Sequence, residues 1–111
     1  MKSLIPGSYT FILPASRLVP KMLLTKRHTV GIRSPDHLAC LHLAEQLKGV
    51  LLAVSVKKTA ACGDSIVALE KVFRNDVAFL LDAGDIESES STIVDLTGSE
   101  YEVLRQGKGE I

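Results

Sequence analysis

Basic side chains mark the places where this sequence could bind a phosphate or another anion. Arg33 ends the strand-like run His28–Arg33 and precedes Ser34-Pro35-Asp36, a composition typical of a helix start. A guanidinium there can bind an anion through two hydrogen bonds, beside the backbone N–H groups of the helix. The alternative is a structural role, in which Arg33 pairs with Asp36 or with a carboxylate of the sheet. The clusters Lys26-Arg27-His28 and Lys57-Lys58 could contact phosphates or could be solvated loop residues.

The histidine and cysteine residues do not predict a metal site. His37, Cys40 and His42 are close in sequence, but on a helix Cys40 and His42 project about 160–200° apart. We therefore expect Cys40 to be a core thiol and His42 to be a solvated surface residue. Cys62 lies in a predicted loop with no base near it in sequence, which argues against a nucleophilic cysteine. No dinucleotide-binding, P-loop or metalloprotease motif is present.

The composition is that of one small globular domain. The chain has 111 residues, of which 46% are hydrophobic and 23% are charged, and this balance argues against disorder. No apolar run approaches the roughly 18–20 residues that a membrane-spanning helix needs. Residues 1–7 lack the apolar stretch of a signal peptide, and the two cysteines have no CxxC spacing. We therefore expect a cytoplasmic protein without membrane association and without a disulfide framework.

The net charge of zero conceals an uneven distribution along the chain. Residues 1–58 carry nine basic and two acidic side chains, a charge of +7. Residues 59–111 carry four basic and eleven acidic side chains, a charge of −7. Such a division favours an anion-binding half, a self-complementary surface, or both. The alternative is that opposite charges pair within one folded domain.

Six strands and two helices are expected to position these residues. The strands are predicted at Tyr9–Leu13, His28–Arg33, Val50–Ser55, Val77–Asp82, Thr92–Leu96 and Tyr101–Leu104. The helices are predicted from a Ser34 N-cap to about Lys48 and over Asp64–Asn75, with a helical turn at Lys21–Leu24. Val50–Ser55 and Val77–Asp82 are apolar throughout, which is typical of strands buried on both faces. The order of the elements predicts an α/β sheet with partly parallel pairing.

This arrangement predicts which side chains face inward and where a ligand would bind. The inward faces of the helices are Ala39, Cys40, Leu43, Ala44 and Leu47, and Ile66, Leu69, Val72 and Phe73. Ligands of open α/β sheets gather beyond the carboxyl ends of the strands, which here are Arg33, Ser55 and Asp82. The run Asp82–Asp85 could bind a cation or could cap a turn.

Four segments together resemble one known family. Pro6–Leu13 resembles the "PGxxTxxL" segment of the YrdC/YciO family, and Thr29–His37 resembles its "VxxRxPxH" segment. Ser91–Thr97 resembles "STVVDLT", and Leu104–Gly107 resembles the closing "LRxG". The segments occur in the order of the family and at approximately its spacing. The chain therefore resembles the C-terminal part of the family domain, and its sequence is most similar to the YciO-like branch.

The resemblance implies a fold and a set of partners. The implied fold is a partial YrdC-like twisted open mixed sheet with flanking helices. Residues 1–111 would form a single domain that lacks the N-terminal segment of the family, with its Thr-x-x-Tyr-Gly and Lys-Arg-Lys motifs. The family resembles L-threonylcarbamoyladenylate synthases, which condense threonine, bicarbonate and ATP for the threonylcarbamoyladenosine of tRNA. It also resembles double-stranded RNA-binding folds, so tRNA or double-stranded RNA, ATP and L-threonine are the implied partners.

The resemblance also implies individual residue roles. The nucleotide and threonine cavity would be lined by Thr10, Arg33, Ser55, Ser91 and Arg105. Ser91 would lie near the threonine, and Arg105 would face the nucleotide phosphates. The RNA-binding candidates are Lys26, Arg27, Lys57 and Lys58. No tightly bound cofactor and no metal site are implied, and ATP with magnesium would be a substrate.

One departure from the family pattern bears on catalysis. The family has S-x-N after the buried strand, whereas this chain has Ser55-Val56-Lys57, which keeps the serine and replaces the asparagine. Together with the missing N-terminal motifs, this departure predicts a domain that is incomplete as an enzyme on its own. Two alternatives are an RNA-binding module without catalysis and a subunit completed by a partner chain. The missing strands should also leave apolar sheet edges uncovered, which favours a homodimer or a complementing chain.

Overall fold

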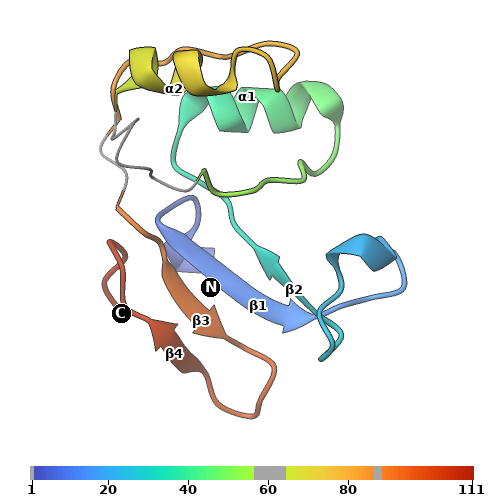
Figure 1. The fold of residues 1–111 in the computed structure, drawn as a ribbon. Helices are drawn as coiled ribbons and strands as arrows, with labels where there is room; N and C mark the ends of the chain where they lie inside the picture. Colours follow the sequence, from blue (N-terminus) through green and yellow to red (C-terminus); the bar gives the residue numbers. More distant parts are fainter. Residues whose placement is uncertain (1, 57–64, 87–88) are drawn as a thin grey trace. The chain divides into compact units, whose positions relative to one another are not determined.

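The computed structural model describes residues 2–56, 65–86 and 89–111 (Figure 1). The elements are the 3-10 helices η1 (Lys2–Leu4) and η2 (Lys21–Leu23), the helices α1 (Leu38–Leu47) and α2 (Ile66–Phe73), and the strands β1 (Tyr9–Pro14), β2 (Thr29–Ile32), β3 (Thr92–Asp95) and β4 (Glu102–Arg105). They fall into two compact units, one formed by Met1–Gln46 with Glu89–Ile111 and the other by Leu47–Ser88. No described helix has the length and apolar character needed to cross a membrane.

The first unit contains a four-stranded open mixed sheet with the order β2-β1-β3-β4 (Figure 1). The central strands β1 and β3 are parallel, with Tyr9 opposite Thr92 and Ile12 opposite Asp95. The outer strands β2 and β4 run antiparallel to their neighbours. These four strands confirm the predictions at Tyr9–Leu13, His28–Arg33, Thr92–Leu96 and Tyr101–Leu104 to within one residue at either end. They also confirm the mixed α/β class.

The core of this sheet is small and partly polar. Phe11 and Val94 are the buried hydrophobic side chains among the described residues, each 3% exposed. They lie on neighbouring parallel strands and directly opposite each other in the register. The buried polar side chains are those of Thr29, Ser91, Thr92 and Asp95. Each of these four makes hydrogen bonds, as buried polar groups must to offset their lost hydration.

The C-terminal residues pack against the start of β1 and β3. The Thr92 hydroxyl donates to the Gly109 carbonyl (2.5 Å) and accepts from the Gly107 N–H (2.9 Å). The Tyr9 hydroxyl donates to the Glu110 carbonyl (2.7 Å). A Cβ atom on Gly109 would overlap the Tyr9 ring, and one on Gly107 would overlap the Ser90 carbonyl. The absence of a side chain at both glycines therefore allows this close contact.

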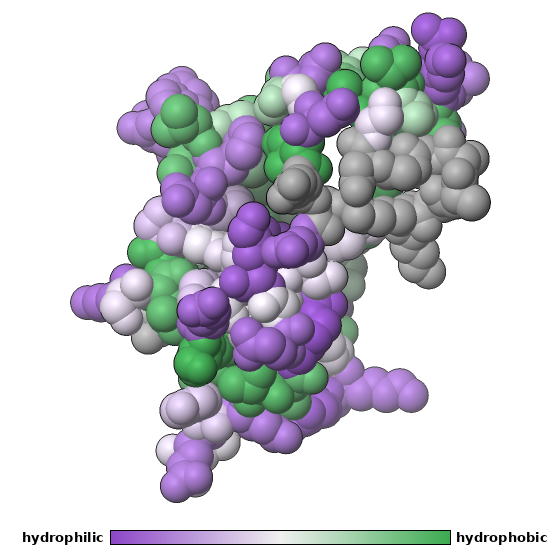
Figure 2. Space-filling model, turned by 90° about the vertical axis from the view of Figure 1, so that its left-hand side faces the viewer, coloured by the Kyte–Doolittle hydropathy of each residue, from purple (hydrophilic) through white to green (hydrophobic). Residues whose placement is uncertain are grey.

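The edge strand β4 is exposed along its whole length. Its exposed apolar residues include Val103 and Leu104, which are 38% and 48% exposed. Figure 2 shows hydrophobic patches among hydrophilic ones in the lower part of the face that it views. Glu102 and Arg105 place a charge at each end of the strand, an arrangement that discourages edge-to-edge pairing.

Helix α1 begins later than the sequence predicted. The expected N-cap was Ser34, but its carbonyl accepts the Gly7 N–H (2.8 Å), a bond that continues the contact between the β1 and β2 segments. The first helical bond is instead Leu41 N–H to the His37 carbonyl (3.1 Å). The predicted inward face is half-buried at Ala39, Cys40 and Ala44, and it is wrong at Leu43 and Leu47, which are exposed. Cys40 is therefore not a core thiol.

Two predicted strands are wrong in the second unit. Val50–Ser55 and Val77–Asp82 have no regular secondary structure and are exposed, Val54 by 88% and Phe79 by 75%. Neither segment pairs with any strand that the structure describes. Apolar composition favours a buried strand, but the strand forms only where a neighbour supplies the hydrogen bonds. Helix α2 is present, which confirms the core of the predicted helix over Asp64–Asn75. Ile66, Leu69 and Phe73 of its predicted inward face are half-buried, whereas Val72 is exposed.

Candidate functional site

One edge of the four-stranded sheet brings together residues from distant parts of the sequence. Because β1 and β3 are parallel and their outer neighbours are antiparallel, β1 and β3 begin at the edge where β2 and β4 end. Thr10 is the second residue of β1, Ser91 directly precedes β3, and Arg105 is the last residue of β4. The topology thus places three of the five predicted cavity residues side by side.

Hydrogen bonds join these three residues into one cluster. The hydroxyls of Thr10 and Ser91 lie 2.8 Å apart. The Arg105 guanidinium donates from Nε and Nη2 to the Ser91 carbonyl (3.1 and 2.8 Å), and Nη2 also reaches the Ser91 hydroxyl (3.3 Å). Ser91 is therefore the centre of the cluster. We call Thr10, Ser91 and Arg105 the edge cluster.

The strand register explains why the edge cluster shares one face of the sheet. Ile93 lies opposite Thr10 on β1 and opposite Arg105 on β4. Side chains two residues apart in a strand point to the same face, so Ser91 projects beside Ile93 and toward both partners. Ser91 is 6% exposed, whereas Arg105 is exposed. The Arg105 Nη1 group forms no hydrogen bond with any residue that the structure describes.

Arg33 lies at the same edge but outside the edge cluster. It follows the last residue of β2, and the register that pairs Phe11 with Ile32 would place it opposite Thr10 if continued by one residue. Its side chain is exposed. Among residues 2–56, 65–86 and 89–111 it forms no ion pair with Asp36 or with a carboxylate of the sheet.

The other predicted site residues lie elsewhere or are not described. Ser55 is exposed and belongs to the second unit. Lys26 and Arg27 are exposed in the segment between η2 and β2, where β2 begins, and therefore lie at the sheet edge opposite the edge cluster. Lys57, Lys58 and Cys62 lie outside the described residues. Within the described part of the chain, no three metal-ligating side chains lie together.

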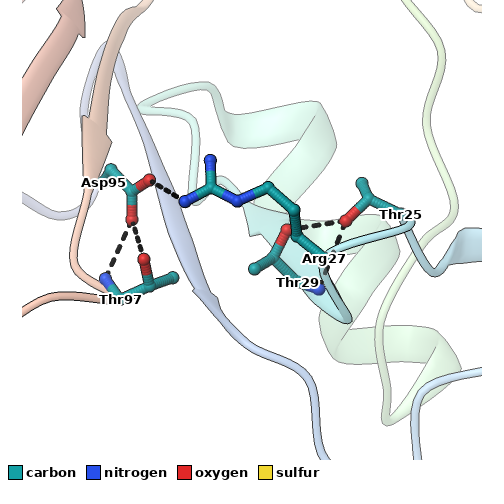
Figure 3. A network of polar contacts seen from close by, with 5 residues as sticks. All are labelled: Thr25, Arg27, Thr29, Asp95 and Thr97. Carbon is teal, nitrogen blue, oxygen red and sulfur yellow. Dashed lines mark hydrogen bonds and ion pairs between the residues drawn. The ribbon is translucent and has the colours of Figure 1, made fainter.

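A polar network that the sequence did not predict surrounds Asp95 (Figure 3). The Asp95 carboxylate accepts hydrogen bonds from the Thr97 hydroxyl (2.6 Å) and the Thr97 N–H (2.9 Å). Its other oxygen lies 3.8 Å from Nη2 of Arg27. Nearby, the hydroxyls of Thr25 and Thr29 lie 2.8 Å apart. The Asp-x-Thr spacing directly after a strand was the available signal, because it is typical of an Asx turn.

These contacts shift the titration of Asp95. The Thr97 hydroxyl and N–H both stabilise the charged carboxylate, and Arg27 adds a smaller attraction. Burial opposes them, but the pKa of Asp95 is still held below its ordinary value of 3.8. The carboxylate is therefore ionised at neutral pH, and it caps the turn between β3 and β4.

Comparison with known proteins relates almost the whole chain to one domain. A model of the Sua5, YciO and YrdC domain, described as telomere recombination, matches residues 1–107. The crystal structure of Escherichia coli YciO superposes with a TM-score of 0.88 at 30% identity and covers 98% of this chain. The structure of Pyrococcus abyssi Sua5 complexed with L-threonine superposes with a TM-score of 0.82 at 29% identity and covers 96% of the chain.

A sequence match adds an enzyme to these relatives. The threonylcarbamoyl-AMP synthase of Chromobacterium violaceum is 32% identical over 92 residues, 82% of this chain and 48% of that protein. The chain spans about half the length of the curated relatives it matches. It corresponds to 54% of the E. coli YciO chain and to 32% of the P. abyssi Sua5 chain.

Proposed function

The chain belongs to the Sua5/YciO/YrdC family, and from this membership we propose that it binds L-threonine and a nucleotide as a domain related to threonylcarbamoyl-AMP synthase. The observation that carries the proposal is the edge cluster, in which Thr10, Ser91 and Arg105 meet at one edge of the sheet. This proposal makes ATP, as its magnesium complex, a substrate and not a resident cofactor. Bicarbonate would be the third reactant.

The chemistry of the edge cluster suits these ligands. L-threonine carries an ammonium, a carboxylate and a hydroxyl, and the hydroxyls of Thr10 and Ser91 can bind such groups as donors or acceptors. The uncommitted Nη1 donors of Arg105 can bind a carboxylate or a phosphate oxygen. Arg33 would supply a second guanidinium at the same edge. Ser91 holds Arg105 through the backbone carbonyl, so the guanidinium is oriented before a ligand arrives.

A titration with amide-resolved NMR tests this proposal. Adding L-threonine or ATP with magnesium should shift the amide signals of β1, of residues 90–93 and of the end of β4. Arg105→Ala should weaken nucleotide binding at least tenfold, because it removes a charge-assisted contact. The matched control is Arg74→Ala, an exposed arginine in the second unit, which should bind as the parent chain does. Shifts distributed over the molecule, or equal losses in both variants, would contradict the assignment.

Catalysis is measured separately from binding. The assay detects release of pyrophosphate from ATP in the presence of L-threonine and bicarbonate. We expect the 111-residue chain alone to bind without substantial turnover, because Ser55-Val56-Lys57 departs from the S-x-N pattern of the family. Clear turnover by the isolated chain would show that it is a complete enzyme.

A second candidate function is binding of tRNA or double-stranded RNA by the segment of residues 15–28. This segment carries Arg17, Lys21, Lys26 and Arg27, all exposed, and no acidic residue. Binding through phosphates should weaken steeply as salt concentration rises. Lys26→Ala with Arg27→Ala should reduce both the affinity and the salt dependence, whereas Lys108→Ala should leave both unchanged. Binding that does not vary with salt would contradict this candidate.

A further inference from the structure

The second unit exposes two uncharged apolar segments, Val50–Val56 and Val77–Leu81. We call them the apolar segments. Val50 is 97% exposed, Val54 is 88% exposed and Phe79 is 75% exposed. The other exposed large hydrophobic residues of the two segments are Leu51, Leu52, Val56, Val77, Leu80 and Leu81. Folded monomers rarely leave so much apolar surface in contact with water, and such surfaces mark interaction sites.

The composition of the apolar segments indicates the kind of partner that would cover them. Neither contains a charged residue. The first is rich in valine and leucine, and the second combines two leucines with a valine and a phenylalanine. This composition is typical of strands that are buried on both faces and hydrogen-bonded on both sides. The segments have no regular secondary structure among the described residues. A partner must therefore supply backbone groups for strand pairing as well as apolar contacts.

A cavity in the same unit indicates which charge a partner side chain should carry. It has a volume of about 360 Å³ and is lined by Ile66, Val67 and Leu80 together with the carboxylates of Glu70 and Asp82. Three apolar side chains and two acidic ones suit a partner side chain with an apolar stem and a basic end, such as lysine or arginine. A second copy of this chain would bring the same carboxylates to the interface, and their repulsion disfavours self-association.

We propose that the apolar segments are a docking surface for a polypeptide equivalent to the part of E. coli YciO that this chain does not match. The chain superposes over 98% of its own length on only 54% of YciO, with a TM-score of 0.88. The apolar segments therefore belong to a domain whose relative, E. coli YciO, contains nearly as many unmatched residues as matched ones. Docking would pair both segments into strands and would place basic side chains of the partner near Glu70 and Asp82.

Mixing the two polypeptides tests this proposal. The probe is the unmatched part of E. coli YciO, expressed separately and added to the 111-residue chain. Light scattering should detect a one-to-one complex, and the amides of residues 51–56 and 77–81 should exchange hydrogen at least tenfold more slowly in it. Val54→Asp with Phe79→Asp should weaken the complex at least tenfold. Leu18→Asp, at a leucine 92% exposed in the first unit, should leave it unchanged.

The outcomes separate this proposal from the alternatives. The substituted side chains are exposed, so protection of the β1 and β3 amides verifies that each variant is folded. No complex, or a complex unaffected by Val54→Asp with Phe79→Asp, would overturn the proposal. Protection of the apolar segments in a homodimer would identify a second copy as the occupant and would also overturn it. Binding of L-threonine by the edge cluster is measured independently, so failure of either proposal leaves the other standing.

Discussion

Ser91 links the edge cluster through two different groups. Its hydroxyl contacts Thr10, and its carbonyl accepts both bonds that orient the Arg105 guanidinium. A side-chain substitution at Ser91 therefore removes only the hydroxyl contacts, while the backbone anchor of Arg105 persists. This separation allows the two contributions to be measured one at a time.

We expect Ser91→Ala to destabilise the fold by about 1 kcal/mol, because the half-buried Thr10 hydroxyl loses its partner. Urea unfolding measures this difference. The control is Ser99→Ala, at an exposed serine between β3 and β4, which should change stability by less than about 0.5 kcal/mol. Equal effects at both positions would show that the hydroxyl pair does not stabilise the fold.

Asp95 makes stability depend on pH in a definite direction. Its pKa is lowered in the folded state, from an ordinary value of 3.8, so the unfolded chain binds a proton at higher pH. The stabilisation is complete well above pH 3.8 and is lost as pH falls through the folded pKa. Asp95→Asn should therefore destabilise the protein at pH 7, and the difference from the parent chain should shrink below about pH 3.8.

Unfolding in urea at pH 7, 5 and 3 measures this trend. Glu102→Gln is the control, since Glu102 is an exposed carboxylate of β4. A difference between the parent chain and Asp95→Asn that is constant over all three pH values would contradict the role assigned to the Thr97 contacts.

At the scale of elements, the C-terminal segment fits against β1 and β3 only because two of its residues lack side chains. Gly109→Ala would place a methyl group within the Tyr9 ring, which must then move. We expect a loss of about 1–3 kcal/mol, typical of overpacking. The matched control is Gly49→Ala, whose new methyl group would make only an ordinary 3.7 Å contact with the Leu47 carbonyl. Thermal unfolding followed by circular dichroism measures both variants.

The strands illustrate what the sequence could and could not predict. The runs at Tyr9–Leu13 and Thr92–Leu96 are rich in residues that favour β-strands, and the structure pairs the two strands with each other. Val50–Ser55 and Val77–Asp82 have an even stronger apolar signal but form no strand. Hydrophobic composition records that a segment requires burial, whereas strand formation also requires a neighbour with free hydrogen-bonding groups.

The candidate site was predictable only in part for a related reason. Family motifs identified Thr10, Ser91 and Arg105 as individual residues. Their contact depends on the parallel pairing of β1 with β3, which joins positions more than 80 residues apart in the sequence. Local spacing carries no information about that pairing. The Ser34-Pro35 helix start was wrong because a long-range bond from Gly7 occupies the Ser34 carbonyl.

At the scale of the whole molecule, the two units differ in how far their apolar residues are buried. The first unit has a hydrogen-bonded sheet around Phe11 and Val94, and the second leaves its apolar segments exposed. Local stability should differ accordingly. In the isolated chain we expect the amides of β1 and β3 to exchange at least ~100-fold more slowly than those of residues 51–56 and 77–81. Hydrogen exchange followed by NMR measures this ratio, and uniform protection would contradict it.

The parallel pairing of β1 with β3 has a consequence for how the chain is made and how it can change. Among the described strands, β1 has only β2 as a neighbour until the ribosome has added residues 92–95, so the centre of the sheet forms only after the second unit has been synthesised. The whole second unit is then a connection between two elements of the first. The entropy of closing such a connection rises by only about 0.6 kcal/mol for each doubling of its length. Insertions and deletions within residues 47–88 but outside the apolar segments should therefore accumulate during evolution with little effect on the sheet that holds Thr10, Ser91 and Arg105.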